Sequence, residues 1–372
     1  MNPKVKICHL TSINPSDDIR IFHKQCSSLA KAGYETYLVC HGESFVKNDV
    51  NVVGLGLRPS SRLKRFFSFS RQVYKKALEI DAEVYHIHNP DLLPFGMKLK
   101  RKGKIVVFDS HEHFFESIKA SAWIPRPFRW ALATVYGIIE KKVCSKIDAV
   151  VYVTPTQRDK FDSYGVKTQL ITNFPIIEDD SETALRTSNR KLCFAGGISP
   201  EWMHENIIPV LEECDATYEL AGTVLEGYLN ELKALTGWER VNFMGRIPFD
   251  EVSPMLQGCA VGMALLKPSG NTAGNMGTLG NNKFFEFMQN GLPIICTDFA
   301  LWKEIIDTDK CGIYVNPDSK EDIVRAILYL LDNPQKANEI GKNGRKAVME
   351  KYNWSTQEEK LLELYRGFIT KG

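Results

Sequence analysis

Short apolar runs rich in valine and isoleucine recur along the chain and alternate with segments whose apolar residues repeat at helical spacing, such as residues 20–31. Continuous apolar strands separated by amphipathic helices are typical of a parallel β-sheet that is covered on both faces. The first series of apolar runs, which we predict to be strands, comprises residues 4–10, 34–40, 82–88, 104–110, 148–154 and 168–173. The pattern therefore predicts an α/β fold.

The same pattern starts again after a break at Asn173-Phe174-Pro175 and a polar stretch at residues 178–191. The second series of predicted strands comprises residues 192–197, 217–222, 241–245, 260–266, 292–298 and 312–316. The simplest interpretation is two similar α/β domains, residues 1–173 and 174–352, joined by one linker. Residues 353–372 begin with a capping-type sequence, N-W-S-T-Q-E-E, and continue with apolar residues at helical spacing. We expect this helix to pack back on the first domain.

Length and composition restrict the class of protein. A chain of 372 residues is expected to form two domains at about 150 residues each. A hydrophobic content of 44% is enough to bury a sizeable core, which excludes a disordered chain. Lys and Arg total 47 against 45 Asp and Glu, so the net charge is only +2. We therefore expect no nucleic-acid partner, because dedicated nucleic-acid binders carry a strongly basic field.

The nine cysteines are odd in number, form no C-x-x-C pair and in several cases lie inside apolar runs. This usage predicts reduced, buried thiols in a cytosolic protein rather than disulfides or a zinc site. No apolar stretch approaches the ~18 residues of a transmembrane helix, and the apolar run after Lys6 is too short for a signal peptide. The expected location is the cytoplasm, with contact at the inner face of the plasma membrane.

The stretch with the clearest chemistry is residues 267–302. Four glycines and four asparagines between Gly270 and Asn282 predict a loop, followed by a helix from about Asn282 to Gln289. A glycine-rich loop that leads into a helix N-terminus offers free backbone N–H groups and a positive dipole end to an anion. Lys283 in the first helical turn suits a phosphate. Glu286, one turn later, is placed to accept hydrogen bonds from sugar hydroxyls.

This stretch resembles the nucleotide-sugar site of glycosyltransferase family 4, through K-F-F-E-F-M-x-x-G-L-P-I-I and the following D-F-x-x-W-x-E-I-I. Other matching motifs are Y-H-I-H-N-P-D at 85–91, D-S-H-E at 109–112, F-A-G-G-I at 194–198 and V-N-F-M-G-R-I at 241–247. The resemblance implies the GT-B fold, in which two Rossmann-like domains face each other across a cleft. It also implies a retaining, metal-independent hexosyltransferase without a cofactor. The expected reaction moves a sugar from a UDP-sugar to a glycan or lipid-linked acceptor in the synthesis of surface polysaccharide or glycoconjugates.

The resemblance also implies roles for individual residues. The expected donor-binding residues are Gly196, Gly197, Gly245, Arg246, Ile247, Lys267, Asn275, Met276, Gly277, Lys283 and Glu286. Within this set Glu286 would bind the ribose, residues 245–247 would lie beside the base, Gly196 and Gly197 would admit the diphosphate, and residues 275–277 would hold the sugar or its phosphate. His111 and Glu112 are the catalytic candidates at the junction of donor and acceptor. Asp18, Arg20 and His88 follow strands at their ligand-binding ends and are the acceptor-binding candidates.

Three departures from the family pattern leave an alternative open. Thr278 stands where the family often has a first Glu, and the Arg and Lys that commonly follow the turn at 196–197 have no counterpart in I-S-P-E-W-M-H-E. The first loop, I-N-P-S-D-D, also lacks the usual glycines. The alternative is a catalytically inactive GT-B partner subunit. An NAD-dependent dehydrogenase is disfavoured because no G-x-G-x-x-G follows the first strand.

Simpler interpretations exist for several of these residues. Glu286 has the spacing of a helix-surface carboxylate paired with Lys283, and Asp18 that of a helix N-cap. The cluster D-S-H-E-H at 109–113 also invites a metal interpretation. We expect no metal there, because residues at i, i+2 and i+3 of one segment do not converge on an ion.

A basic surface is expected in the first domain. Residues 58–76 contain seven basic residues and no acid, with apolar residues at helical spacing. We expect the C-terminal half of this segment to pack inward, and residues 62–69 to meet anionic lipid together with residues 123–130. Residues 1–180 contain 27 Lys and Arg against 19 Asp and Glu, a balance of +8, whereas the remainder has 20 against 26, a balance of −6. This asymmetry suits a first domain that rests on an anionic membrane.

Overall fold

The chain forms two compact units. The computed structural model describes residues 4–121, 124–177 and 189–369. Unit 1 comprises Met1–Asn173 with Trp354–Gly372, and unit 2 comprises Phe174–Asn353. Most of the polar stretch at 178–191, and Trp123 in the basic surface, lie outside the described residues.

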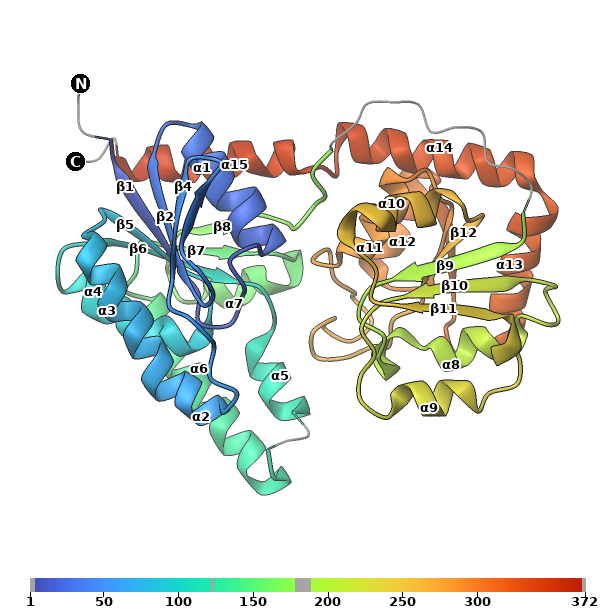
Figure 1. Ribbon diagram of the computed structural model, residues 1–372, viewed down its shortest axis with the longest axis horizontal. Helices are drawn as coiled ribbons and strands as arrows, with labels where there is room; N and C mark the ends of the chain where they lie inside the picture. The colour runs from blue at the N-terminus through green and yellow to red at the C-terminus, as the bar shows by residue number, and fades with distance from the viewer. Residues whose placement is uncertain (1–3, 122–123, 178–188, 370–372) are drawn as a thin grey trace. The chain divides into compact units, whose positions relative to one another are not determined.

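Unit 1 is built on an eight-stranded sheet in the order β3-β4-β2-β1-β5-β6-β7-β8 (Figure 1). All neighbouring strands are parallel except β3, which is antiparallel to β4. The strands are β1 (Lys6–Leu10), β2 (Glu35–Cys40), β3 (Phe45–Lys47), β4 (Val50–Gly54), β5 (Val84–Ile87), β6 (Ile105–Ser110), β7 (Ala149–Tyr152) and β8 (Thr168–Leu170). Six of these strands were predicted from the sequence. The prediction missed β4 and the short edge strand β3, whose three residues are all exposed.

Helices cover both faces of this sheet. They are η1 (Ile19–Cys26), α1 (Ser27–Lys31), α2 (Arg62–Lys64), η2 (Arg65–Phe69), α3 (Ser70–Ile80), η3 (Pro90–Leu92), α4 (Leu93–Lys100), α5 (Phe114–Ala120), α6 (Arg126–Cys144), η4 (Pro155–Gln157), α7 (Arg158–Asp162) and α15 (Trp354–Ile369). The helix expected at residues 20–31 forms as the π-helix η1 followed directly by α1. Val73, Tyr74 and Ala77 of α3 are buried in the core. The prediction that the C-terminal half of residues 58–76 packs inward is therefore confirmed.

The helix α15 completes unit 1 although it follows unit 2 in the chain. Trp354 Nε1 donates to Ser28 Oγ at 2.9 Å. The backbone N–H of Thr172 donates to Gln357 Oε1 at 3.0 Å. Tyr365 is fully buried, and its hydroxyl forms a hydrogen bond of 2.7 Å with His86 Nδ1. The helix therefore contributes both apolar and polar contacts to the interior of unit 1.

A buried lysine ties together the two chain segments of unit 1. Lys24 Nζ donates to the side-chain oxygen of Asn173 at 2.7 Å and lies 5.9 Å from the centre of the Trp354 ring. Asn173 is the last residue of the first segment, and Trp354 is the first residue of the second. Lys24 thus binds unit 1 at both points where the chain crosses between the units.

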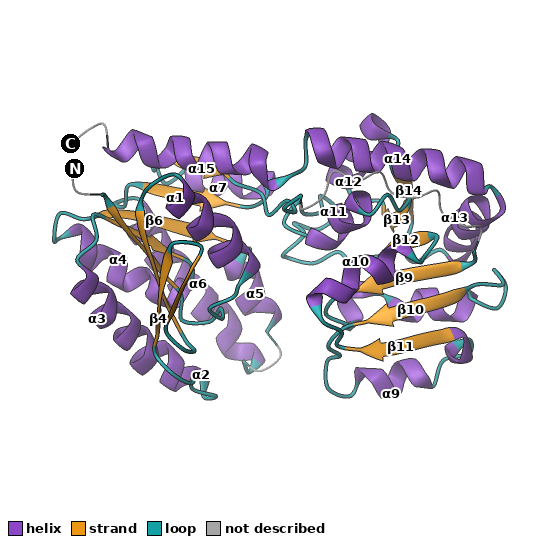
Figure 2. Ribbon diagram, turned by 45° about the horizontal axis from the view of Figure 1, so that its top comes forward, coloured by secondary structure: helices purple, strands orange, loops and turns teal. Residues whose placement is uncertain are grey.

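Unit 2 contains a six-stranded parallel sheet in the order β11-β10-β9-β12-β13-β14 (Figure 2). The strands are β9 (Lys191–Ala195), β10 (Thr217–Ala221), β11 (Val241–Gly245), β12 (Val261–Ala264), β13 (Ile294–Thr297) and β14 (Gly312–Val315), all six of which were predicted. The helices are η5 (Pro200–Trp202), α8 (His204–Ile207), η6 (Ile208–Val210), α9 (Tyr228–Lys233), η7 (Trp238–Arg240), α10 (Phe249–Gln257), α11 (Asn282–Gln289), α12 (Ala300–Asp309), α13 (Lys320–Asp332) and α14 (Pro334–Glu350).

Both sheets have the strand order of a Rossmann fold. In unit 2 the first three strands run outward from β9 and the next three run outward from β12, so the order reverses between β9 and β12. In unit 1 the same reversal lies between β1 and β5. Ligands of open α/β sheets bind beside such a switch point, outside the carboxyl ends of the strands. The prediction of two Rossmann-like sheets is confirmed. The topology predicts ligand sites at the carboxyl ends of β1, β5, β9 and β12.

All nine cysteines are free and buried, as the sequence predicted. Burial raises the pKa of the Cys214 thiol to about 11 and that of Cys311 to about 12. Within the described residues, no helix has both the length and the apolar content needed to cross a bilayer.

Candidate functional site

Three glycines line the carboxyl ends of neighbouring strands on one side of the switch point of unit 2. Gly196 follows β9, Gly222 follows β10, and Gly245 ends β11. Gly196 donates its N–H to Ala221 O at 2.9 Å, and Gly222 donates to Gly245 O at 2.7 Å. A β-carbon on Gly222 would lie 1.6 Å from Gly196 O, and its φ is +148°. Only glycine permits this conformation and this close approach, so the strand ends form a backbone surface without side chains.

Lys283 lies across this surface. It is in the first turn of α11, and its N–H is capped by the side chain of Asn281 at 3.1 Å. A β-carbon on Gly196 would be 1.8 Å from Lys283 Cε and 2.5 Å from Nζ, so the lysine occupies the space that the glycine leaves. The ammonium group stands 5.7 Å from the centre of the Phe194 ring and 5.2 Å from the nearest ring of Trp202. The helix N-terminus and the glycine surface thus converge on one cation.

The charge of Lys283 is compensated only in part. Burial lowers the pKa of Lys283, and the charge of Glu286 opposes this shift. Among the described residues, Nζ has two aromatic contacts but no ion pair. A partly desolvated ammonium that faces aromatic rings is stabilised by an incoming anion. The arrangement is chemically suited to bind a phosphate group.

The glycine-rich loop before α11 is attached to α12. The carbonyl oxygens of Asn275 and Met276 accept hydrogen bonds of 3.0 Å from the N–H groups of Ala300 and Leu301, the first residues of α12. Gly277 has φ +85°, and a β-carbon there would lie 2.6 Å from Phe299 Cβ. These contacts hold the loop close to the N-terminal end of α12, while the side chains of Asn275 and Met276 are exposed.

Position 278, where the family pattern often has Glu, has a structural role. The carbonyl oxygen of Thr278 accepts a hydrogen bond from Trp302 Nε1 at 2.8 Å, and its hydroxyl accepts from Gly280 N at 3.0 Å. Trp302 is fully buried. Thr278 therefore links the loop to the core of unit 2.

His204, in the segment I-S-P-E-W-M-H-E that lacks the expected Arg and Lys, is a core residue. It is fully buried, and its Nδ1 forms a hydrogen bond of 3.1 Å with the Tyr218 hydroxyl. Burial lowers the pKa of His204 to about 3, so the ring is neutral at physiological pH. The cation at this end of the sheet comes from Lys283 instead.

The other predicted donor residues differ in their surroundings. Gly197 faces open space, since a β-carbon there would meet no atom within 4 Å. Arg246 and Lys267 are exposed, Ile247 is partly exposed, and Glu286 is half-buried one turn after Lys283. The structure brings Gly196, Gly245 and Lys283 together through the glycine surface. Among the described contacts, none joins Arg246 or Lys267 to Lys283.

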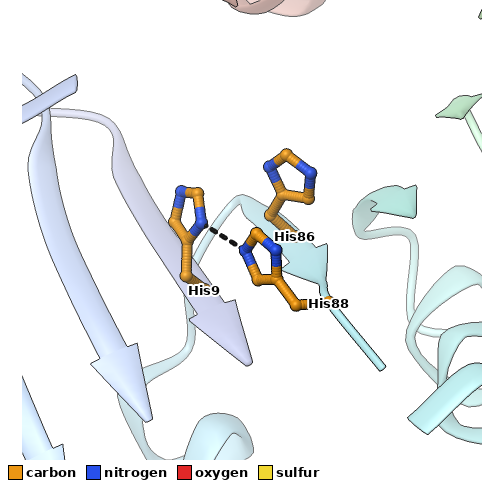
Figure 3. A group of neighbouring side chains, drawn as sticks. All are labelled: His9, His86 and His88. Atoms are coloured by element: carbon orange, nitrogen blue, oxygen red, sulfur yellow. Dashed lines mark hydrogen bonds between the residues drawn. The ribbon is translucent and has the colours of Figure 1, made fainter. Parts of the chain in front are cut away.

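A buried histidine cluster occupies the switch point of unit 1. His9 lies in β1, His86 lies in β5, and His88 follows the end of β5 (Figure 3). His9 Nδ1 and His88 Nε2 form a hydrogen bond of 2.8 Å. Burial lowers the pKa of His88 to about 3 and those of His9 and His86 well below the usual range. The three rings are therefore neutral at physiological pH.

Asp109, at the end of β6, connects this cluster to polar groups of η1. Its carboxylate accepts hydrogen bonds from Arg20 Nε at 3.0 Å, Arg20 Nη2 at 2.8 Å and Gln25 Nε2 at 2.6 Å. Burial alone would raise the pKa of Asp109, but the charges of Arg20 and His111 hold it well below its usual range. Asp109 is thus a carboxylate fixed in position inside the unit.

His111 is the accessible member of this network. Its side chain is 24% exposed, and its Nε2 lies 3.3 Å from Asp109 Oδ2 and 3.3 Å from His88 Nδ1. The neighbouring Glu112 is exposed, and its carboxylate accepts a hydrogen bond from Ser117 Oγ at 3.3 Å. Buried Gln157 and Ser110 hold the backbone carbonyl of Glu112, whereas the side chain of His111 itself contacts Asp109 and His88.

The acceptor-binding candidates lie in two environments. Asp18 is the N-cap of η1 and accepts hydrogen bonds of 2.8 Å from Ile21 N and from Asn14 Nδ2. The capping interpretation of Asp18 is therefore confirmed. Arg20 and His88 are buried; Nε and Nη2 of Arg20 bind Asp109, and both ring nitrogens of His88 contact other histidines. Contact of these three residues with an acceptor stays a prediction.

Sequence reasoning did not select Gly222, Asp109, Gln25 or His9. A signal for Gly222 was available, because β9 and β10 each end in an alanine that is followed by a glycine, and β11 ends in Gly245. The contact between Asp109 and Gln25 has no such signal, since it depends on how η1 packs on the sheet. Within the described residues, two groups of side chains are close enough to hold a metal ion: His9, His86 and His88, and His88, Asp109 and His111.

Comparison with known proteins identifies two family models along the chain. The model Glycosyltransferase Family 4 matches residues 20–175, and the model Glycosyl transferases group 1 matches residues 189–333. A GDP-mannose-dependent alpha-(1-6)-phosphatidylinositol monomannoside mannosyltransferase of Mycobacterium tuberculosis is 23% identical over 262 residues, which is 64% of this chain and 66% of that protein. The match covers 21% of the length of one curated relative and 66% of the length of another, so this chain spans less than two thirds of each.

Solved structures are similar over the whole chain. Sucrose-phosphate synthase from Thermosynechococcus elongatus superimposes with a TM-score of 0.79 at 15% identity and covers 100% of both chains. HepE of Anabaena, in complex with UDP and glucose, superimposes with a TM-score of 0.71 at 14% identity and covers 98% of this chain and 100% of its own. At these identities the similarity establishes the shared fold.

Proposed function

Because the chain belongs to glycosyltransferase family 4 and has the GT-B fold, we propose that it transfers a hexose from a nucleotide-sugar to an acceptor hydroxyl with retention of the anomeric configuration. The donor binds at the switch point of unit 2. The acceptor is a glycan or a lipid-linked sugar in the synthesis of surface polysaccharide or glycoconjugates.

The observation that carries the donor site is the position of Lys283 on Gly196. A nucleotide-sugar presents a diphosphate, which needs a cation, hydrogen-bond donors and close approach to the backbone. The glycine surface removes side chains from the strand ends, α11 directs its N-terminus toward them, and Lys283 has no ion pair among the described residues. An anion with two phosphates satisfies all three features at once.

The rest of the donor extends from this point. Glu286 follows Lys283 by one turn and would accept hydrogen bonds from the ribose hydroxyls. Residues 245–247 would flank the base, and the loop at 275–277 would hold the sugar. We favour UDP as the nucleotide, and HepE, which shares the fold, binds UDP and glucose. The mannosyltransferase relative is GDP-mannose-dependent, so GDP-sugars belong in the same test.

In the proposed reaction the bond between the sugar C1 and the diphosphate oxygen breaks, and the acceptor oxygen bonds to C1 on the same face. The departing diphosphate oxygen takes the proton of the acceptor hydroxyl, so no separate protein base is needed. Lys283 and the N-terminus of α11 stabilise the charge on the leaving group, with Arg246 and Lys267 as further cations. We assign His111 and Glu112 to the reacting sugar, and no divalent metal to the leaving group.

The surface of unit 1 supports an acceptor at a membrane. The helix α6 exposes Phe128, Leu132, Val135 and Ile139, which repeat at helical spacing along one stripe. Leu63 of α2 and Phe66 and Phe67 of η2 are also exposed. In Figure 1 the helix α2 lies at the lower end of unit 1, as does the beginning of α6. Such stripes, together with basic residues such as Lys64 and Arg126, favour binding to anionic lipid. We propose that this surface rests on the inner face of the plasma membrane and presents unit 1 to a lipid-linked acceptor.

A thermal-shift screen with UDP, GDP and their sugars tests the donor site directly, because ligand affinity adds to the stability of the folded protein. We expect one nucleotide to raise the melting temperature in the wild type and to lose this effect in Glu286→Ala. Transfer to a lipid-linked acceptor, with the anomeric configuration read by NMR, tests the reaction. A donor that binds without transfer would favour the inactive partner subunit. If no nucleotide raises the melting temperature at millimolar concentration, the proposed donor site is excluded.

A further inference from the structure

Three ligand-type atoms at the switch point of unit 1 form an equal-sided triangle. His88 Nδ1 lies 3.3 Å from His111 Nε2 and 3.4 Å from Asp109 Oδ2, and the latter two atoms are 3.3 Å apart. The atoms come from two strand ends, since His88 follows β5 while Asp109 and His111 belong to β6 and the loop after it. We propose that these three side chains bind a divalent transition-metal ion such as Zn²⁺.

The size of the triangle matches three ligands around one ion. Hydrogen bonds between nitrogen and oxygen are usually 2.7–3.2 Å long, with a mode near 2.9 Å. All three edges are longer than this range. Ligand atoms at about 2.0–2.1 Å from a tetrahedral zinc ion lie about 3.3–3.4 Å from one another. The triangle therefore has the dimensions of three corners of a zinc tetrahedron.

Neighbouring groups hold the three ligands in place. The second ring nitrogen of His88 hydrogen-bonds to His9 Nδ1 at 2.8 Å (Figure 3). Arg20 and Gln25 fix the carboxylate of Asp109 through three hydrogen bonds of 2.6–3.0 Å. Ligating histidines and carboxylates commonly have such partners, which orient the ligands and set the tautomer. With Nδ1 of His88 directed to the ion, its Nε2–H is the donor to His9.

The deeper group of His9, His86 and His88 is a poorer site. The His88 ring is stacked on the rings of both His9 and His86, with interplanar angles of 19° and 18°. Lone pairs of ring nitrogens lie in the ring planes, so nearly parallel rings do not direct them at one point. The His88 and His111 rings are instead inclined at 65°. The triangle with His111 is the arrangement in which the ring planes can converge.

The site is accessible, and two of its three ligands are imidazole rings. The partly exposed side chain of His111 gives an ion a path from solvent, and a tetrahedral ion would keep a fourth position for water. Imidazole nitrogens with one carboxylate suit Zn²⁺, Co²⁺ or Ni²⁺ rather than Mg²⁺ or Ca²⁺. Because Arg20 already compensates the charge of Asp109, we expect micromolar rather than nanomolar affinity.

If the protein has the proposed transferase function, an ion bound at the triangle inhibits transfer. An ion at the triangle occupies His111 Nε2, so His111 cannot contact the reacting sugar. Bound Zn²⁺ is therefore expected to lower the transfer rate at least about tenfold, and a chelator is expected to restore it. The ion acts as a reversible inhibitor and takes no part in the transfer step.

Titration of the intact wild-type protein with Co²⁺ tests the site without any sugar donor. We expect one equivalent to produce the visible absorption of a tetrahedral ion, and Zn²⁺ to displace it. His111→Phe and His88→Phe are expected to raise the Kd at least about tenfold. His113→Phe, a half-buried histidine two residues away that binds Thr156, and His86→Phe serve as matched controls with unchanged Kd.

Each outcome of this titration has a defined meaning. Because His111 is partly exposed, His111→Phe decides the question even where His88→Phe does not fold. Absence of stoichiometric binding overturns the proposal, as does loss of binding in His86→Phe with retention in His111→Phe. An intense sulfur-to-cobalt band would assign the ion to cysteines and would also overturn it. Metal binding without inhibition would keep the site and reject only the role of His111 in transfer.

Discussion

The side chain of Lys283 occupies the space where residue 196 would carry a β-carbon: a β-carbon on Gly196 would lie 1.8 Å from Lys283 Cε. Gly196 directly follows β9 and Lys283 lies in α11, so the two residues are far apart in the chain but in contact at the switch point of unit 2. The position of the cation in the proposed donor site therefore depends on the absence of a side chain at residue 196.

Gly196→Ala tests this dependence. The new methyl group collides with Lys283, and φ +152° is strained for any residue other than glycine. We expect unit 2 to lose about 1–3 kcal/mol of stability and the nucleotide to bind more weakly. Urea unfolding and nucleotide titration measure the two effects.

Gly197→Ala is the matched control, because a β-carbon at residue 197 meets no protein atom within 4 Å. Its stability should change by less than about 0.5 kcal/mol. A decrease in nucleotide affinity without loss of stability would indicate that Gly197 faces the diphosphate. Equal destabilisation by both substitutions would contradict the collision with Lys283.

Lys283→Met separates stability from binding. The ammonium group is partly buried without an ion pair among the described residues, so an apolar side chain of similar length should leave the melting temperature unchanged or raise it. Loss of the charge should weaken nucleotide binding by about 1.5–3 kcal/mol, which is roughly 10- to 100-fold in Kd. Thermal shifts with and without nucleotide measure both quantities. The control is Lys233→Met, at an exposed lysine of α9, which should change neither the melting temperature nor the nucleotide affinity. An unchanged nucleotide affinity in Lys283→Met would show that Lys283 does not bind the diphosphate.

His204 predicts a pH dependence for unit 2. Burial lowers its pKa to about 3 in the folded state, against about 6.5 in the unfolded chain. Between these values the unfolded state binds the proton and the folded state does not, so stability falls as the pH decreases. At pH 5 the loss should be about 2 kcal/mol relative to pH 8. Urea unfolding at both pH values should show that His204→Gln, which can still hydrogen-bond to Tyr218, loses about 2 kcal/mol less than the wild type. Identical losses would mean that His204 takes up a proton in the folded state.

The apolar stripe of α6 predicts membrane binding. Phe128 and Val135 are 64% and 51% exposed, so replacing Phe128, Leu132 and Val135 by Ser should not change the stability. Co-sedimentation with anionic vesicles should decrease, because each inserted apolar side chain contributes about 1.5–3 kcal/mol. Leu225→Ser, at a 58% exposed residue of unit 2, is the control. Equal binding of the wild type to neutral and anionic vesicles, or no binding, would argue against the membrane surface.

Much of the fold follows from local sequence pattern. All six strands of unit 2 were predicted from mostly apolar runs, although Glu219 interrupts β10 and Asn242 interrupts β11. The helix α11 has the predicted bounds because Asn282 and Gly291 mark its two ends. The strand β3 was missed because it has only three residues, all of them exposed. The sequence V-N-V-V-G of β4 is similar to V-N-F-M-G of β11, so β4 had a signal that the prediction overlooked.

Site residues could be predicted from the sequence only where a single continuous segment contains the residues that together form a recognisable motif. The glycine-rich loop and Lys283 are contiguous with a helix start, and the chemistry of that pattern is general. The network around Asp109 is different, because packing alone brings Arg20 and Gln25 of η1 and His88 after β5 to this carboxylate. For the same reason the expectation of no metal considered only residues 109–113, whereas the triangle takes its third member from the strand next to β6.

The place of α15 in unit 1 has a consequence for the order of folding during synthesis. The ribosome delivers residues 1–173 first, but Tyr365, Gln357 and Trp354, which bond to His86, Thr172 and Ser28, emerge only after all of unit 2. Unit 2 is contiguous and can close as soon as it is made. Unit 1 must wait with the histidines of its switch point uncovered. The domain that is translated first is therefore the one that is finished last.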